Sequence, residues 1–526
     1  MLDTVICGGR VLNGTEEPEK EIDVGLKDGK IAALGDLRAA EAQERIQARG
    51  RVVCPGFLDL HRHADGAVFR RGYGDGDLFQ GITTVINGNC GLSLAPQLPP
   101  YQKDLAAYLE PVTGPYEGVP VESLGAYQEA LSKVPLAVNA GMLAGGGALR
   151  GSVCGFSKTQ LEKADIRAIQ RLLEQTLFQG ALGVSLGLGY APECFYSTEE
   201  LIEVLAPIAH SKTVLSVHMR SEAMHLLPSI EEMLTVARAL DVPLQLSHLK
   251  GTGRENWGKT VPLALARIAA AREQGLDVCC DAYPYTFGST QLVHILPPEC
   301  LKGGMAALTQ RLGEGGERQR IKARLRAGRD FDNYVHLIGW ENIYPTSLVC
   351  PEDEVYIGKS LLEGAQGGDP ADFAFDLLRR NRCRVTMMDT LTVPEDIAAI
   401  YQTPFAYVIS DATFPATGRL HPRVCGAFAA ILETFVNQRH DLTLPEAIHR
   451  MTRRPADRYG LTHKGRIELG ADADVLVFAP ENIHVNATVS NPTALSSGMD
   501  YVFVNGKAAV YEGRRQDIFA GKVLLC

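Results

Sequence analysis

The sequence has no apolar run long enough to cross a membrane, so we expect no membrane partner. Its N-terminus shows no basic segment followed by an apolar one. No secretory signal peptide is therefore visible, and a cytoplasmic location is expected. There is also no excess of positive charge. Asp and Glu total 62 against 52 Lys and Arg, and the resulting net charge of -10 argues against a nucleic-acid partner.

Two further patterns are missing. The 12 cysteines are scattered rather than framed as in a small secreted domain, so we interpret them as thiols in a reducing compartment. No Gly-x-Gly-x-x-Gly motif joins a strand to a helix, which argues against a doubly wound dinucleotide-binding sheet. The glycine-rich stretch Ala144–Gly151 is not followed by a helix of the right pattern. With 45% apolar and 22% charged residues, the 526-residue chain predicts one large globular domain and a smaller one.

Both ends of the chain consist of short strand-like runs separated by turns such as "KDGK", a pattern typical of hairpins. We expect residues 1–56 and 456–526 to form a small β-sandwich together. Between them, strand-like runs alternate with amphipathic helical stretches, which predicts an α/β fold, a (β/α)8 barrel with insertions over residues 57–455. The strand candidates are "GFLDLH", "ITTVINGNC", "PLAVNAGML", "ALGVSLGL", "TVLSVHMR", "PLQLSHLK", "DVCCDAYPY", "RVTMMD" and "FAYVISD".

Ionisable and sulfur-containing side chains end five of these strands. In a closed parallel barrel the C-terminal strand ends converge on the face where ligands bind. Alternate residues of a strand share a face, so His61 and His63 should point together while Arg62 points away. The residues at these strand ends are His61, His63, Cys90, His218, His248 and Asp411.

Imidazole, thiolate and carboxylate groups are the ligands that zinc and similar metals prefer. Each residue alone has an ordinary structural interpretation: a single histidine is usually hydrogen-bonded, and a lone cysteine is usually a small buried hydrophobe. The recurrence of such groups at the same place on successive strands favours a metal site. We interpret the other histidines, His294 among them, as structural or solvated.

With these residues in place, the sequence resembles the amidohydrolase superfamily of metal-dependent hydrolases, through "VVCPGFLDLHRH" and "KGRIELGADADVLVF". Within it, the chain is most similar to the N-acyl-D-amino-acid deacylase (D-aminoacylase) family. Dihydroorotase and dihydropyrimidinase relatives carry a carboxylated lysine on the fourth strand, where this chain has Ser185 and no lysine nearby. The motifs that carry the resemblance along the chain are "QGITTVINGNCGLSLAP", "GALGVSLGLGYAP", "HMRSE", "SHLKGTGRENWGK", "DAYPYTFGSTQL" and "HPRVCGAF".

The resemblance implies a site for one tightly held zinc and a second, weaker metal position whose occupancy is left open. The residues it assigns to the tight site are Cys90, His218 and His248, and those it assigns to the second are His61, His63 and Asp411. Three protein ligands leave room on zinc for a water, whose pKa the metal lowers to roughly 7. Asp411 would accept the proton of that water and pass it to the leaving nitrogen.

The implied reaction is hydrolysis of an N-acyl-D-amino acid, a small-molecule substrate, to a carboxylate and a free D-amino acid. The α-carboxylate of such a substrate needs a binding site made of cationic or hydroxyl groups, which we call the carboxylate seat. The candidate seat consists of Lys250, Tyr190, Tyr283, Ser289 and Arg423. Candidates for orienting the metal ligands are Asp65, Asn89 and Arg220.

The chain departs from the family pattern at two places. It has Gly145-Gly146-Gly147 where Gly-His-Gly is common, and Ala412 where glycine commonly follows the catalytic aspartate. Both departures leave open which acyl group and which side chain the substrate carries, and whether its α-carbon must have the D configuration. Two alternatives stay open: hydrolysis of a cyclic amide or imide, and a non-catalytic relative that binds small molecules. The sequence leaves the oligomeric state undetermined, a homo-oligomer included.

Overall fold

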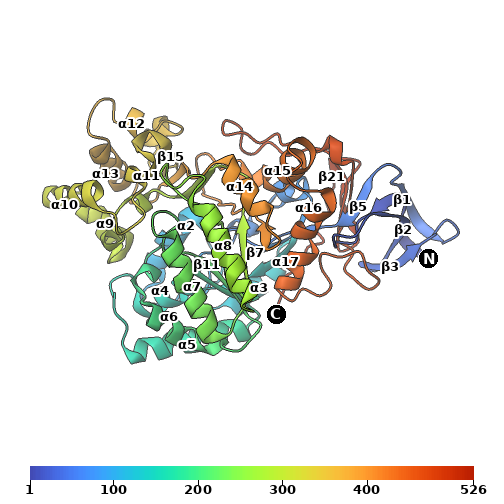
Figure 1. Ribbon diagram of the computed structural model, residues 1–526, viewed down its shortest axis with the longest axis horizontal. Helices are drawn as coiled ribbons and strands as arrows, with labels where there is room; N and C mark the ends of the chain where they lie inside the picture. Colours follow the sequence, from blue (N-terminus) through green and yellow to red (C-terminus); the bar gives the residue numbers. More distant parts are fainter.

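The computed structural model describes residues 1–526 as a parallel barrel with a β-sheet domain at one end and a helical insertion at the other (Figure 1). Hydrogen bonding links the barrel strands in the order β6-β7-β8 and β9-β10-β11-β12-β13-β17, with β8 and β9 separated only by Leu143. The barrel closes where His63 pairs in parallel with Thr413. The strands are β6 (Phe57–Asp59), β7 (Ile82–Asn87), β8 (Asn139–Met142), β9 (Ala144–Gly145), β10 (Gly183–Gly187), β11 (Val214–His218), β12 (Leu244–Leu246), β13 (Val278–Ala282) and β17 (Ala406–Val408).

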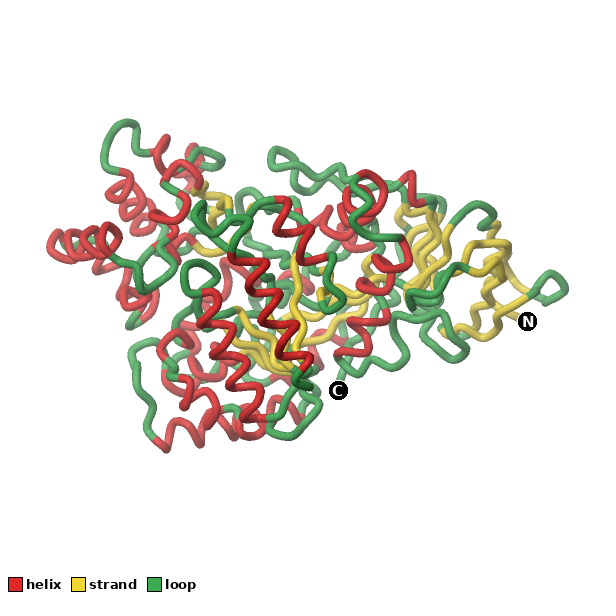
Figure 2. Tube along the Cα trace, in the orientation of Figure 1, coloured by secondary structure: helices red, strands yellow, loops and turns green.

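These strands form because their residues are buried on both faces. β7 and β11, for example, are buried at every position, as expected when a parallel sheet is covered by helices. Figure 2 shows helices surrounding the strands on their outer side. The covering helices are α1 (Asp75–Leu78), α2 (Gln102–Thr113), α3 (Leu124–Ser132), α4 (Gly146–Cys154), α5 (Lys163–Phe178), α6 (Thr198–Val204), α7 (Leu226–Leu240), α8 (Thr260–Glu273), α14 (Pro394–Tyr401), α15 (Arg423–Ala430), α16 (Leu444–Met451) and α17 (Arg453–Arg458).

Both ends of the chain build the smaller domain, as expected. Its sheet runs β21-β20-β19-β18-β5-β1-β2-β3, with β4 paired to β1. Asp28 and Gly29 both have positive φ in the β2–β3 turn, the conformation favoured in two-residue hairpins. α17 crosses the expected limit at residue 455, so we propose that the barrel domain includes this helix. The strands are β1 (Leu2–Val11), β2 (Lys20–Lys27), β3 (Lys30–Gly35), β4 (Ala42–Gln47), β5 (Val52–Pro55), β18 (Val475–Phe478), β19 (Met499–Val504), β20 (Lys507–Tyr511) and β21 (Arg514–Arg515).

A long insertion between β13 and β17 carries a three-stranded antiparallel sheet, which we call the roof sheet: β14 (Phe287–Gln291), β16 (Thr386–Thr390) and β15 (Ile343–Ser347). The stretch "RVTMMD", expected among the barrel strands, forms β16 instead. That expectation was wrong because an apolar run does not distinguish a barrel strand from a buried antiparallel one. The helices of the insertion are α9 (Gly304–Arg311), α10 (Gly315–Ala327), α11 (Tyr334–Ile338), α12 (Leu361–Gly364) and α13 (Pro370–Arg380).

The helices of the protein are all too short or too polar to span a bilayer. Most of the glycine-rich stretch Ala144–Gly151 lies within a helix, α4, which begins at Gly146. That helix packs against α5 and β10, and its N-terminal glycines approach the backbone that follows β7.

Candidate metal centre

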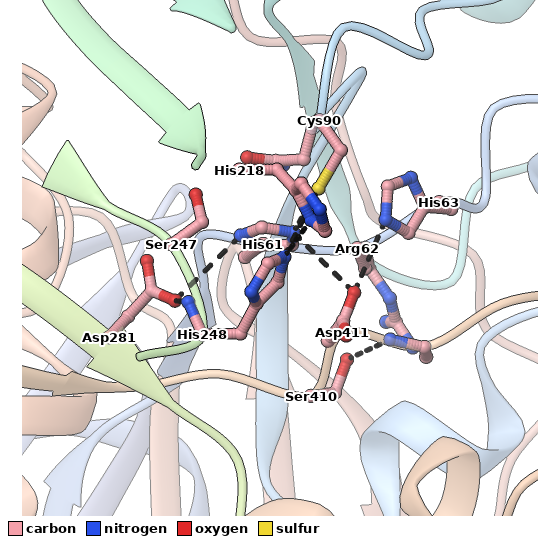
Figure 3. A network of polar contacts seen from close by, with 12 residues as sticks. His61, Arg62, His63, Cys90, His218, Ser247, His248, Asp281, Ser410 and Asp411 are labelled. Carbon is pink, nitrogen blue, oxygen red and sulfur yellow. Dashed lines mark hydrogen bonds and ion pairs between the residues drawn. The ribbon is translucent and has the colours of Figure 1, made fainter. Parts of the chain in front are cut away.

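The residues that end the barrel strands lie together at the C-terminal mouth of the barrel. Figure 3 shows their imidazole nitrogens, the sulfur of Cys90 and the carboxylate of Asp411 directed toward a common centre. His218 is the last residue of β11, and the others lie just beyond their strands, on the loops that leave the barrel. All six are almost fully buried; the most exposed, Asp411, reaches 8%.

The potential ligand atoms are within a few ångströms of one another. The Cys90 sulfur lies 3.4 Å from His248 Nε2, which in turn lies 3.1 Å from His218 Nδ1. The same sulfur lies 3.2 Å from His61 Nε2. Asp411 Oδ1 lies 3.5 Å from that nitrogen and 3.2 Å from His63 Nε2. Cys90 and His61 therefore connect the two halves of one cluster.

This spacing fits a metal. Zinc–sulfur bonds of about 2.3 Å and zinc–nitrogen bonds of about 2.0 Å in a tetrahedron place ligand atoms roughly 3.3–3.6 Å apart. The Cys90, His218 and His248 atoms lie within 4.8 Å of one another, as do those of His61, His63 and Cys90. A thiol and neutral imidazoles are the donor set that zinc prefers.

The pKa values of these groups also favour a bound cation. Burial raises the pKa of the Cys90 thiol well above its usual range, and the nearby carboxylate of Asp411 raises it further. A thiolate in this position therefore requires a positive charge beside it, which a bound metal provides. Burial lowers the pKa of His218 well below its ordinary value, which keeps the imidazole neutral and able to act as a ligand.

The backbone is strained at three of the six residues. Cys90, His248 and Asp411 have φ values of 53°, 34° and 51°, in the left-handed region that non-glycine residues seldom adopt. Each such conformation costs on the order of 1 kcal/mol or more, and strain of this kind concentrates at functional sites.

Asp411 is held as a carboxylate by its surroundings. Although burial opposes ionisation, the Arg423 guanidinium and His63 keep the pKa of Asp411 well below its usual value. The Arg423 Nη1 lies 2.8 Å from Asp411 Oδ2, so the other carboxylate oxygen is the one that faces the two histidines. Arg423 was expected to bind substrate, and in the structure it also fixes the candidate base.

A buried ion pair between Glu222 and Lys250 contacts the Nδ1 nitrogen of His248. Glu222 Oε1 lies 2.7 Å from His248 Nδ1, and both Glu222 oxygens accept hydrogen bonds of 2.8 Å from the Lys250 ammonium. Burial opposes ionisation of Glu222, but Lys250 and His248 hold its pKa below the ordinary value. A carboxylate on the far nitrogen orients a ligating histidine and makes it more basic. Glu222 was not singled out from the sequence, although it lies within "HMRSE", four residues after His218.

Removal of the Glu222 charge should therefore weaken both the fold and the metal site. For Glu222→Gln we expect a loss of about 3 kcal/mol in unfolding free energy, because Lys250 is left buried without its counter-ion. We also expect metal affinity to fall about 10-fold or more. Urea unfolding and a competition assay with a chromogenic chelator measure the two effects. Glu129→Gln, at an exposed ion pair, is the control and should change neither; equal behaviour of the two variants would contradict the assigned role.

Two more buried aspartates hold the strand ends in place. Asp281 accepts hydrogen bonds from the His248 amide (2.5 Å) and from Gln245 Nε2 (2.7 Å), and lies 3.8 Å from His61 Nδ1. Asp59 accepts the Ser410 amide at 3.0 Å, which ties β6 to the strand that precedes Asp411. Sequence reasoning missed both: Asp281 is the penultimate residue of β13, and Asp59, the last residue of β6, precedes His61 and His63, which the strand-end pattern selected instead.

The structure brings the expected carboxylate seat to the same mouth. The Arg423 guanidinium lies 4.7 Å from the centre of the Tyr283 ring and donates to the Ser289 carbonyl. Tyr190 stacks on His218 with 4.2 Å between ring centres, and its hydroxyl lies 3.3 Å from Thr290 Oγ1 in β14. The roof sheet therefore covers the metal ligands.

A cavity of about 320 Å³ opens beside His218 and Tyr190. His294, interpreted from the sequence as structural, lines it and stacks 4.3 Å from Tyr190. Burial lowers the pKa of His294 to about 3, so this imidazole is neutral. Nothing in the sequence marks it, because it lies in the insertion rather than at a strand end. The remaining walls include Leu188, Phe195, Leu296, Leu301, Phe331 and Tyr334.

The three residues expected to orient the ligands have different positions. Asn89 donates to the Leu60 and Ile86 carbonyls, and Asp65 accepts the Leu94 amide, so both brace the loops around Cys90. Arg220 instead pairs with Glu232 at 2.9 Å, away from the cluster.

The carboxyl group of Glu193 fills the space beside Gly146. A Cβ at Gly146 would lie 2.4 Å from Glu193 Oε1 and 2.7 Å from Leu186 Cδ2, so a larger residue there would require these side chains to move. Glu193 is buried, accepts the Gly187 amide at 2.8 Å, and has its pKa raised to about 8 by burial. It also touches Gly91, the residue after Cys90. A buried carboxyl group therefore lies beside both Gly146 and the loop that carries Cys90.

Comparison with known proteins adds to this geometry. Residues 397–510 match the Amidohydrolase family. The chain is 33% identical to the D-aminoacylase of Alcaligenes xylosoxydans xylosoxydans, over 99% of this chain and 97% of that protein. It is 32% identical to the N-acyl-D-aspartate deacylase of the same organism, over 98% and 93%. A D-aminoacylase crystal structure superposes over both entire chains with a TM-score of 0.83 and 32% identity. The zinc and phosphonate complex of N-acyl-D-glutamate deacylase from Bordetella bronchiseptica superposes with a TM-score of 0.81 and 30% identity, again over both entire chains.

Proposed function

The chain belongs to the D-aminoacylase family of amidohydrolases, and we propose that it hydrolyses the amide bond of N-acyl-D-amino acids to a carboxylate and a free D-amino acid. The observation that carries the proposal is the cluster of Cys90, His218 and His248 beside the ionised Asp411. A metal-ligand set next to a carboxylate base is what amide hydrolysis requires. A protein that only binds a ligand would need neither, and Ser185 in place of a strand-end lysine argues against the usual cyclic-amide chemistry.

Cys90, His218 and His248 would hold the zinc ion. The relative from Bordetella bronchiseptica was solved with zinc and a phosphonate that mimics the tetrahedral intermediate. When bound, a zinc ion would supply a nucleophilic water at neutral pH and would polarise the scissile carbonyl. For a structure of D-aminoacylase, one metal is described as activating and the second as attenuating. We infer the same order here, with His61, His63 and Asp411 as the weaker position.

Asp411 moves the proton. Its Oδ1, the oxygen that faces the histidines, accepts a proton from the attacking water and returns it to the amide nitrogen, which is a poor leaving group unless protonated. Arg423 holds Oδ2 so that Oδ1 stays aimed at the reacting atoms. Burial of both side chains excludes bulk water from this transfer.

The substrate carboxylate would bind beside Lys250, Arg423 and Tyr283. The Lys250 ammonium contacts both Glu222 oxygens and lies 3.0 Å from His248 Nδ1. Arg423 Nε has no partner although it is buried. Tyr283 lies against both cations, with its ring centre 5.9 Å from Lys250 Nζ. The two cations, with the free Nε of Arg423, provide the positive potential that an α-carboxylate needs.

A panel of matched N-acetyl-D- and N-acetyl-L-amino acids, assayed for released amine with zinc-loaded protein, tests the proposal. We expect hydrolysis of D-compounds and little or none of their L-counterparts. Hydantoin and dihydrouracil belong in the same panel. Turnover of these cyclic amides without turnover of any D-compound would replace the proposed function with cyclic-amide hydrolysis.

A further inference from the structure

Asp389, in the middle strand of the roof sheet, is a buried carboxylate with no partner in the protein. It is 2% exposed, and neither of its oxygens accepts a hydrogen bond. An unpaired buried carboxylate is costly and seldom kept without a reason. None of the roles derived above for the metal or the proton uses it.

The position of Asp389 relates it to the candidate carboxylate seat. In β16 it pairs with Gly288 of β14. A Cβ on Gly288 would lie 2.5 Å from Leu391 Cδ1, 3.1 Å from the Tyr283 hydroxyl and 3.4 Å from Asp389 Oδ1. Asp389 and Tyr283 are therefore both neighbours of Gly288.

Charged groups near Asp389 affect its pKa. Burial raises its pKa to about 7, while Lys250 and Arg423, neither in contact with it, act to lower the pKa. On the other side, burial raises the pKa of Tyr334, and the Asp389 carboxylate adds to the effect. Tyr334 lines the 320 Å³ cavity. Asp389 is thus near enough to the cations of the carboxylate seat and to Tyr334 for its charge to interact with theirs.

Substrate geometry then determines which part of the ligand reaches Asp389. The acyl group is separated from the α-carboxylate by the scissile nitrogen and Cα, whereas the side chain branches from that same Cα. A group beside the carboxylate seat but outside it therefore meets the side chain. An anionic residue there repels acidic side chains and attracts cationic ones.

We propose that Asp389 selects substrates whose D-amino-acid side chain is basic, by pairing with the side-chain cation. This inference rests on the proposed function and narrows its substrate class. It separates this chain from the relatives named for N-acyl-D-aspartate and N-acyl-D-glutamate.

The test compares kcat/KM for Nα-acetyl-D-lysine, Nα-acetyl-D-norleucine and Nα-acetyl-D-glutamate. Norleucine keeps the lysine carbon chain without the ammonium. For the zinc-loaded protein we expect lysine to be preferred over norleucine by at least about tenfold, and glutamate to be the poorest. Asp389→Asn should lower kcat/KM for lysine about 30-fold or more and change that for norleucine less than about threefold.

Two controls distinguish recognition from a structural role. Asp330→Asn removes an exposed carboxylate at the cavity rim, already paired with Arg324, and should leave the preference unchanged. Because Asp389 has no partner to lose, the thermal midpoint of Asp389→Asn should stay the same or rise. A lowered midpoint, or an equal loss for lysine and norleucine, would overturn the inference.

The assays distinguish a failure of the role of Asp389 from a failure of the deacylase function. Hydrolysis of D-norleucine or D-glutamate compounds without a preference for lysine would overturn the role of Asp389 and leave the deacylase function standing. Absence of turnover with every D-compound would overturn both.

Discussion

Replacing Cys90 with alanine is expected to leave the protein without tightly bound zinc and to lower kcat/KM by at least about 10³-fold. Metal chemistry contributes several kcal/mol to such a reaction, and each 1.36 kcal/mol is about tenfold in rate. Cys90 is expected to have the largest effect because its sulfur lies next to both His248 and His61, so its loss opens both halves of the cluster. Zinc content by atomic absorption and release of amine are measured on the same sample.

Cys54→Ala is the matched control for this experiment. Cys54 is also fully buried, but it lies in β5 of the sandwich and only donates weakly to the Pro55 carbonyl. We expect this variant to keep its zinc and its activity. Undiminished zinc in Cys90→Ala would remove Cys90 from the ligand set.

Asp411→Asn is expected to reduce kcat by about 10²- to 10⁴-fold, the usual range for the loss of a general acid–base group. An amide at this position fills the same space but cannot accept the proton. Because Cys90, His218 and His248 are unchanged, we expect zinc at the tight site to be retained and KM to change little. Steady-state kinetics with one D-substrate and zinc analysis measure these quantities.

The outcome for Asp411→Asn separates a base from a simple ligand. If Asp411 only held the weaker, attenuating metal, its replacement would leave kcat unchanged or raise it. A kcat within about fivefold of the unmodified protein would contradict the proton-transfer role. The unfolding midpoint is needed alongside, because Arg423 loses its charged partner in this variant.

The sequence predicted for a physical reason that these six side chains lie together. Each of the six residues follows a buried apolar run, and the C-terminal ends of parallel strands must meet at one mouth. Strand-end position is therefore enough to bring His61 near His248 although they lie far apart in the chain. The barrel could be predicted from the alternation of strands and helices. The sandwich could be predicted from the short strands and turns at both ends of the chain.

The insertion and the supporting residues could not be predicted this way. β16 has the apolar composition of a barrel strand, and only its antiparallel partners distinguish it. Glu222 and Asp389 act from a loop and from the roof sheet, where no periodicity links them to the mouth. Glu193 occupies the space beside Gly146, a contact between distant segments that the glycine alone does not reveal.

We propose that one zinc at the Cys90 cluster makes this protein a hydrolase of N-acyl-D-amino acids. The most direct measurement is a zinc titration of chelator-stripped protein, with D-amino acid release followed at each step. We expect no activity without metal and a linear rise to a plateau at about one zinc per chain. Full activity in the metal-free protein, or activity that begins only after the second zinc, would contradict the claim.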